Sequence, residues 1–230
     1  MSARRAVLLV GSARPPGTGN SEALATYLLA RLVEGGMETE AFHVHRCQRP
    51  ERERALFEAV DGTDLFVLST PLYVDALPYL VTRCCERMAA HRAAERNESN
   101  LQNEHRSRMV ALVNCGFPEL EHTRVALDIC RVFAREASFF WAGGLGLGGG
   151  EAIGGKPLEE VGGMARHVRG GLDLAAEALL ADRVIPEEAQ AELARPMIPS
   201  RLYTTLGNWG WLRLARKKGT LRRLWDRPLG

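Results

Sequence analysis

Blocks of apolar and polar residues alternate along the chain and predict five buried strands separated by helices. RAVLLVG (5–11) is a continuous apolar run, typical of a strand covered on both faces in a parallel sheet. The strands are expected at 5–11, 38–45, 64–70, 109–116 and 138–148. The helices are expected at 20–33, 50–62, 79–96, 119–137 and 159–183, with a polar loop at 97–108.

This alternation predicts an α/β fold with a doubly wound parallel sheet and helices on both faces. Ligands of such folds bind beyond the carboxyl ends of the strands, where the strand order reverses. The loops after the first, third and fourth strands are therefore the candidate site. We expect one domain over 1–185 and a basic, tryptophan-containing extension over 186–230.

Composition narrows the class of protein. The 230 residues carry a net charge of +2, and no apolar run approaches the roughly 20 residues of a spanning helix. The N-terminus shows no signal-peptide pattern, so we expect a cytoplasmic protein. Five cysteines without C-x-x-C spacing and six scattered histidines predict neither disulfides nor a metal site.

The first candidate loop reads GSARPPGTGNS (11–21) and joins the first strand to its helix. Its hydroxyl and amide side chains, its glycines and the positive end of the helix dipole form a site suited to a phosphate group. It has no lysine and matches neither the Walker A loop nor G-x-G-x-x-G. A phosphate held on a cofactor fits this loop, and the alternative is an ordinary capped helix.

The loop resembles that of flavodoxin-fold NAD(P)H-dependent FMN reductases, which often read G-S-x-R and then G-N-S/T. This chain has two extra residues, near Pro16 and Gly17. STPLYVDALP (69–78) is similar to the family's second flavin loop, S-P-x-Y-x-x-x-x-P, with Pro71 shifted by one. The resemblance covers roughly residues 5–180 and implies the strand order 2-1-3-4-5.

The resemblance also implies where FMN binds. Backbone amides at 72–74 would bond the edge of the isoalloxazine ring, Tyr73 would pack near it, and 114–118 would lie along its pyrimidine side. The implied cofactor-binding residues are Ser12, Arg14, Thr18, Gly19, Asn20, Ser21, Pro71, Leu72, Tyr73, Val74, Asn114, Cys115, Gly116 and Phe117. We interpret Cys115 as a bystander, because no histidine pairs with it in the sequence.

By this resemblance the chain is an oxidoreductase that passes hydride from NAD(P)H through flavin N5 to a quinone, an azo or nitro compound, or a free flavin. No side chain is expected to act as a catalytic acid or base. The alternatives are a flavodoxin-type electron carrier and a flavin-free interaction module of the same fold. Members of the family usually pair, so a homodimer or homotetramer is expected.

The C-terminal segment is strongly basic and contains tryptophan. From Arg195 onward it holds nine Lys or Arg residues and one acid, Asp226. Such a segment can bind a membrane surface or an acidic partner. We expect it instead to pack on its own acidic body or on a second copy, and we find no nucleic-acid-binding motif. GGLGLGG (143–149) matches G-x-G-x-x-G only formally. It is expected to be a mobile segment beside the cofactor, and the alternative is an ordinary flexible loop.

Overall fold

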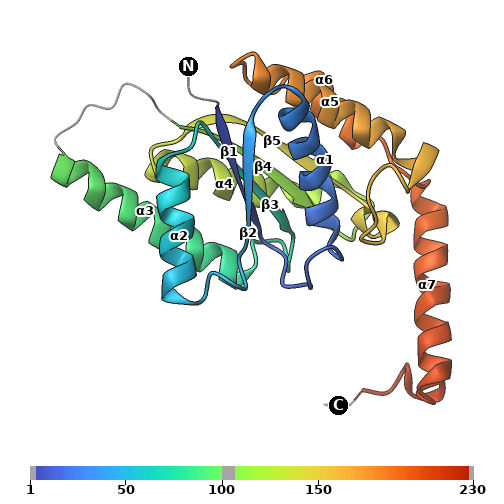
Figure 1. Ribbon diagram of the computed structural model, residues 1–230. Coiled ribbons are helices and arrows are strands. Elements are labelled where there is room, and N and C mark those ends of the chain that lie inside the picture. The colour runs from blue at the N-terminus through green and yellow to red at the C-terminus, as the bar shows by residue number, and fades with distance from the viewer. Residues whose placement is uncertain (1–3, 100–106, 228–230) are drawn as a thin grey trace. The chain divides into compact units, whose positions relative to one another are not determined.

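The computed structural model describes residues 4–99 and 107–227. For residues 96–99 it describes the backbone alone. Its centre is one parallel sheet of order β2-β1-β3-β4-β5 (Figure 1). The strands are β1 (Arg5–Val10), β2 (Glu38–His43), β3 (Leu65–Pro71), β4 (Arg108–Asn114) and β5 (Phe140–Leu147). The predicted flavodoxin-like α/β class and strand order are confirmed.

Helices cover both faces of the sheet and divide the core in two (Figure 1). One face packs under α1 (Asn20–Glu34) and α5 (Arg166–Leu180), and the other under α2 (Pro50–Asp61), α3 (Tyr79–Ser99) and α4 (Arg124–Glu136). Alternate residues of β1 and β3 point into the two cores, because successive side chains of a strand face opposite sides. The described chain also contains four short 3₁₀ turns, η1 (Leu120–Thr123), η2 (Gly150–Ile153), η3 (Gly162–Ala165) and η4 (Leu221–Arg223).

Two helix starts differ from the sequence prediction. The helix expected from 159 begins only at Arg166, because Gly162 has a φ of +70° and the chain makes the 3₁₀ turn η3 first. The helix expected from 119 likewise begins at Arg124, after η1. The loop expected at 97–108 falls largely outside the described residues, and α3 extends to Ser99.

The chain forms two compact units, Met1–Met197 and Ile198–Gly230. The predicted boundary at 185/186 lies before α6 (Glu187–Ala194), a short helix that packs on the first unit through Ala189 and Leu193. None of the helices in the described parts of the chain combines the length and apolar character needed to cross a bilayer.

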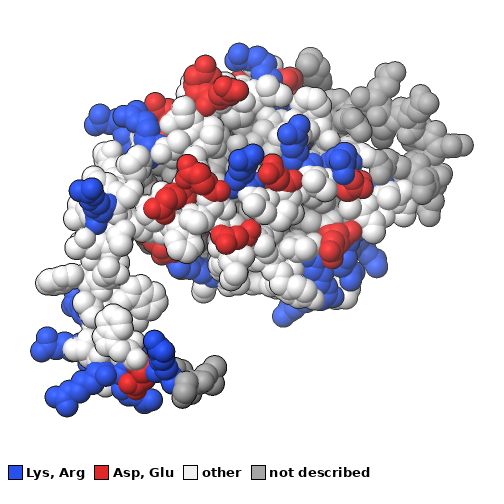
Figure 2. Space-filling model, turned by 180° about the vertical axis from the view of Figure 1, so that it is seen from behind, with Lys and Arg blue, Asp and Glu red and all other residues white. Residues whose placement is uncertain are grey.

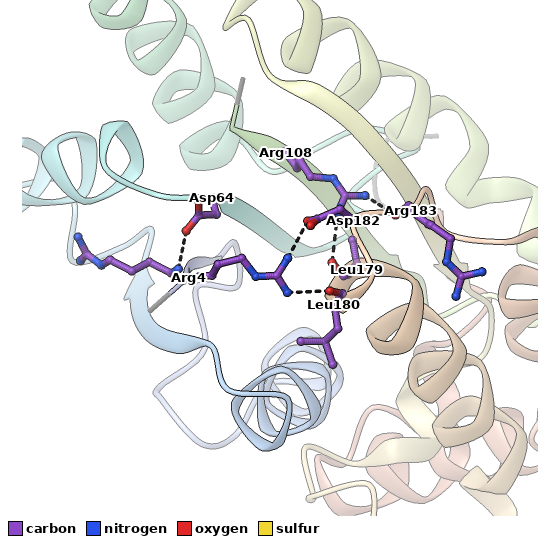
Figure 3. Close-up of polar contacts among 8 residues, drawn as sticks. Arg4, Asp64, Arg108, Leu179, Leu180, Asp182 and Arg183 are labelled. Carbon is purple, nitrogen blue, oxygen red and sulfur yellow. Dashed lines mark hydrogen bonds and ion pairs between the residues drawn. The ribbon is translucent and has the colours of Figure 1, made fainter. Parts of the chain in front are cut away.

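Two arginines hold the end of α5 against the amino-terminal edge of the sheet (Figure 3). Arg4 Nη2 donates to Leu180 O at 2.8 Å, and Arg108 Nη1 donates to Leu179 O at 3.2 Å. Both guanidinium groups also face Asp182, at 2.7 and 3.4 Å. The last carbonyls of a helix lack helical partners, so these contacts satisfy them and complement the helix dipole. This edge is opposite the candidate loops.

We predict that Arg108→Leu lowers the free energy of unfolding by about 2 kcal/mol, because the partly buried carbonyl of Leu179 and that of Arg183 lose a charged donor. Chemical denaturation measures the change. Arg135→Leu is the control, since the Arg135 side chain is exposed and its ion pair in the described chain is with its neighbour Glu136. Equal stability of the two variants would contradict a structural role for Arg108.

Candidate functional site

A buried chain of hydrogen bonds joins the three candidate loops at the carboxyl edge of the sheet. The Ser69 hydroxyl donates to Ser21 O at 2.7 Å, and the Ser21 hydroxyl donates to Asn114 Oδ1 at 2.6 Å. All three residues are buried. β3, the start of α1 and the end of β4 are thereby fixed to one another. The predicted site residues Ser21 and Asn114 do come together, and their side chains bond each other.

The loop after β1 begins at Gly11, which lies close to side chains of β3 and α3. A Cβ on Gly11 would lie 2.7 Å from both Thr70 Oγ1 and Val81 Cγ2, so only glycine fits there. The Thr18 hydroxyl donates to Pro15 O at 2.6 Å, and Arg14 N donates to the buried Ser12 hydroxyl at 3.2 Å. Two of the predicted phosphate ligands, Ser12 and Thr18, therefore also shape the loop itself.

The helix that follows presents its amino terminus to this loop. Gly19 is the N-cap of α1, where Asn20 or Ser21 was expected, and no side chain caps the helix. The amides of the first helical turn have no partners within the helix. They carry the positive end of its dipole, so this end of α1 favours an anion.

Glu151 places a carboxylate at this positive end. Its Oε1 lies 3.4 Å from Arg14 Nη2 and 3.3 Å from Asn20 Nδ2. Glu151 belongs to η2, which is held in place because Gly150 N donates to Cys115 O at 2.8 Å. The Glu151 side chain is 56% exposed. Sequence reasoning missed this residue, whose only signal was the glycine-rich segment around it.

A second carboxylate, that of Glu22, also contacts the loop. Its Oε2 accepts a 2.6 Å hydrogen bond from Gly17 N, and its Oε1 lies 3.0 Å from His43 Nε2. The loop thus brings one arginine and one histidine together with two carboxylates. Any added anion has to compete with the protein's own acids.

The loop after β3 is a tight hairpin. Tyr73 and Ala76 exchange backbone hydrogen bonds of 2.9 and 3.1 Å around Val74 and Asp75, which have φ of 49° and 58°. Positive φ at both central residues is the type I′ geometry, usually supplied by Asn or Gly. A β-branched residue is strained there, and Val74 is 98% exposed.

This hairpin already uses two of the three amides that the resemblance assigns to the flavin ring. Leu72 N donates to Asn114 O at 2.8 Å, and Tyr73 N donates to Ala76 O. Val74 N has no hydrogen-bond partner within the described chain. Pro71 is the last residue of β3, in register with Asn114, and the Tyr73 side chain is half-exposed at the rim.

The loop after β4 contains a sealed thiol and an exposed ring. Cys115 Sγ donates to Phe117 O at 3.3 Å, and burial raises the pKa of the Cys115 thiol. The exposed Phe117 ring lies 4.7 Å from the ring of His122, which is 3.6 Å from Asp75 in the hairpin. Aromatic groups of two loops therefore border the site. A Cβ on Gly116 would lie 3.8 Å from Glu151 Cγ, so the backbone there faces the Glu151 side chain.

The glycine-rich segment after β5 packs closely against the first and third loops. A Cβ on Gly148 would lie 2.4 Å from Pro118 O, and one on Gly155 would lie 2.3 Å from Thr18 O. Gly155 N also donates to Asn20 Oδ1 at 2.7 Å. The glycines permit these approaches, and the segment does not open a helix as the dinucleotide motif requires. Within the described residues, no group of three or more His, Cys, Asp or Glu could hold a metal ion.

Neither a protein-family model nor a curated protein matches this chain. Several solved structures have a fold similar to that of this chain. A flavone reductase has 13% identity and a TM-score of 0.55, over 76% of this chain and 64% of that one. RosB with bound 8-demethyl-8-formylriboflavin-5′-phosphate has 13% identity and a TM-score of 0.50, over 94% and 88%. The Trp repressor binding protein from Bacillus subtilis has 13% identity and a TM-score of 0.50, over 63% and 84%. These likenesses show the flavodoxin-like fold.

We predict that the native protein reacts with iodoacetamide at pH 8 more than about a hundredfold more slowly than a free thiol. All five cysteines are buried, and burial raises the pKa of Cys47 to about 11 and of Cys84 and Cys130 to about 12. Mass spectrometry of the native and the unfolded protein measures labelling. Fast native labelling at Cys115 would contradict its role as a sealed structural thiol.

Proposed function

We propose that this chain binds FMN across the loops after β1, β3 and β4. With it, the chain would transfer electrons from NAD(P)H to a small-molecule acceptor such as a quinone, an azo or nitro compound, or a free flavin. The flavodoxin-like fold brings these three loops to one edge of the sheet. RosB, which has the same fold, is a structure with a bound riboflavin 5′-phosphate derivative.

The observation that carries the proposal is the convergence of Arg14 and Asn20 on one anionic oxygen. Glu151 Oε1 accepts from both side chains, and in our proposal a phosphate oxygen of FMN would take its place. The amino terminus of α1 adds amide donors beside it. The donors are neutral or singly charged, which suits a phosphate that is held rather than transferred.

The phosphate of FMN would have to displace the Glu151 carboxylate. Both contacts of Glu151 Oε1 are long, and the side chain is more than half exposed, so an exposed ion pair of this kind is worth less than about 1 kcal/mol. A phosphate carries more charge and more acceptor oxygens than a carboxylate. We therefore expect the phosphate of FMN to displace the Glu151 carboxylate from Arg14 and Asn20.

The remaining residues would position the flavin and border its ring. Tyr73 and Phe117 offer exposed aromatic surface on two loops, and Val74 N offers an amide that has no partner among the described residues. When bound, the flavin supplies the redox chemistry, so the protein has to contribute anchoring, ring-edge hydrogen bonds and an open face. The sealed Cys115 thiol is not needed for this chemistry.

The test begins with a visible spectrum of the purified protein before and after addition of FMN. We expect a protein-bound flavin spectrum, and NAD(P)H oxidation that depends on both FMN and a quinone acceptor. Bound flavin without NAD(P)H oxidation would favour an electron carrier. A protein that does not bind FMN would favour a flavin-free module, for which the Glu151 contact with Arg14 is the structural argument.

We predict that Arg14→Ala weakens FMN binding about 10- to 100-fold, because a charge-assisted hydrogen bond to phosphate is lost. Riboflavin lacks the phosphate, so its affinity should stay unchanged. Flavin fluorescence quenching measures both affinities. Arg131→Ala, an exposed arginine on α4, is the matched control. An equal loss for riboflavin and FMN would show that Arg14 does not face the phosphate.

Glu151→Gln should strengthen FMN binding about 3- to 10-fold, because the neutral amide neither repels the phosphate nor pairs with Arg14. Riboflavin again serves as the ligand without phosphate, and Glu188→Gln on the exposed side of α6 is the control variant. Weaker FMN binding by Glu151→Gln would mean that the carboxylate supports the cofactor instead of competing with it.

A further inference from the structure

The C-terminal unit exposes an unusual amount of apolar surface. It consists of α7 (Ser200–Lys217), the turn η4 (Leu221–Arg223) and short connections. Trp209, Trp211 and Trp225 are 75%, 72% and 92% exposed. Six further exposed side chains are Leu202, Leu206, Leu212, Leu214, Leu221 and Leu224. Exposed apolar surface of this extent marks an interaction site.

Apolar and charged residues occupy different lengths of α7. Residues 202–212 carry no charge, whereas Lys and Arg are frequent from Arg213 onward. Leu202, Leu206 and Trp209 share one face of the helix, because they are spaced by four and three residues. The uncharged stretch is far shorter than the roughly 20 residues needed to span a bilayer.

The end of α7 folds back and concentrates positive charge. Gly219 has a φ of +68°, Gly219 N donates to Arg216 O at 3.2 Å, and Thr220 N donates to Ala215 O at 2.9 Å. This is a Schellman motif, which ends the helix and reverses the chain. The cations of η4 therefore lie near those of the last turn of α7, as Figure 2 shows at the end of this unit.

Almost none of this charge is neutralised within the unit. Residues 198–230 hold eight Lys or Arg residues and one acid, Asp226, which pairs with Arg223 at 3.0 Å. The other seven cations form no ion pair within the described part of the chain. Their partner must therefore supply a high density of negative charge.

We propose that the C-terminal unit binds the surface of an anionic phospholipid bilayer. The cations would face lipid phosphates and anionic headgroups, while leucine and tryptophan side chains would enter the boundary between headgroups and acyl chains. Tryptophan favours that boundary. The inference does not rest on flavin binding, and it gives the extension a role other than the packing expected from the sequence.

A lipid surface matches these observations better than the other polyanions. Single-stranded nucleic acid would use the cations and would stack on tryptophan, but it offers nothing for six exposed leucines. An acidic face of a second copy would pair with the cations. Only the bilayer offers dense negative charge beside a hydrocarbon phase. The cations and the exposed leucine and tryptophan side chains of the unit therefore both have a partner there.

The test is sedimentation of the full chain with vesicles of phosphatidylserine and phosphatidylcholine, and with phosphatidylcholine alone. We expect binding to the mixed vesicles only, with a blue shift of tryptophan fluorescence. Trp209→Ser with Trp211→Ser should weaken binding at least tenfold. Lys217→Gln with Lys218→Gln and Arg222→Gln should weaken it about a hundredfold. The control replaces Arg124, Arg131 and Arg135 of α4 with Gln and should bind like the wild type.

Three results would overturn the proposal. The first is no sedimentation with the mixed vesicles. The second is binding that the tryptophan substitutions leave unchanged, because that would be adsorption by charge alone. The third is that the C-terminal unit binds another partner instead of the vesicles. That partner would be a single-stranded RNA oligonucleotide, detected by fluorescence anisotropy, or a second copy of the chain, detected as a dimer by gel filtration. FMN content is expected to be the same in all variants, so failure here is distinct from failure of the flavin proposal.

Discussion

The candidate site depends on the buried hydrogen bonds that run from Ser69 through Ser21 to Asn114. Parallel strands all end at the same edge, but that alone does not fix the loops that leave them. Two hydroxyl donors at 2.6–2.7 Å join β3, α1 and β4 where water has no access. Loss of one partner would leave a buried polar group unsatisfied, which costs more than the bond itself contributes. This chain of bonds holds the loop donors before α1 and the aromatic residues of the other two loops in register.

The loop after β1 combines groups that attract an anion with carboxylates that repel one. Arg14, Asn20 and the helix terminus favour an anion, while Glu22 and Glu151 each bring a carboxylate to a different part of the loop. The protein's own Glu151 takes the anion position. In our account the carboxylate holds the loop donors together and then yields to a ligand with more charge. The close packing of Gly155 on Thr18 limits how far the segment carrying Glu151 can move, so the side chain has to turn.

Most strands and helices could be predicted from the sequence, because the residues that indicate them are neighbours along the chain. RAVLLVG and MVALVNCG are apolar enough to identify buried strands, and Pro50 and the glycines after α1 and α2 mark helix ends. Three features had no such signal. Glu151 meets Arg14 and Asn20 only through tertiary contact, across more than a hundred residues. Val74 and Asp75 adopt a turn that usually needs Asn or Gly, and α6 belongs to the first unit although the predicted extension begins at 186.

The central claim is that the loop after β1 exchanges the Glu151 carboxylate for the phosphate of a flavin nucleotide. A crystal structure of the protein soaked with FMN tests it most directly. The account predicts phosphate oxygens within hydrogen-bonding distance of Arg14, Asn20 and the first amides of α1, with the Glu151 side chain turned away. Phosphate density at another place, or Glu151 still bound to Arg14 beside a bound flavin, would contradict it.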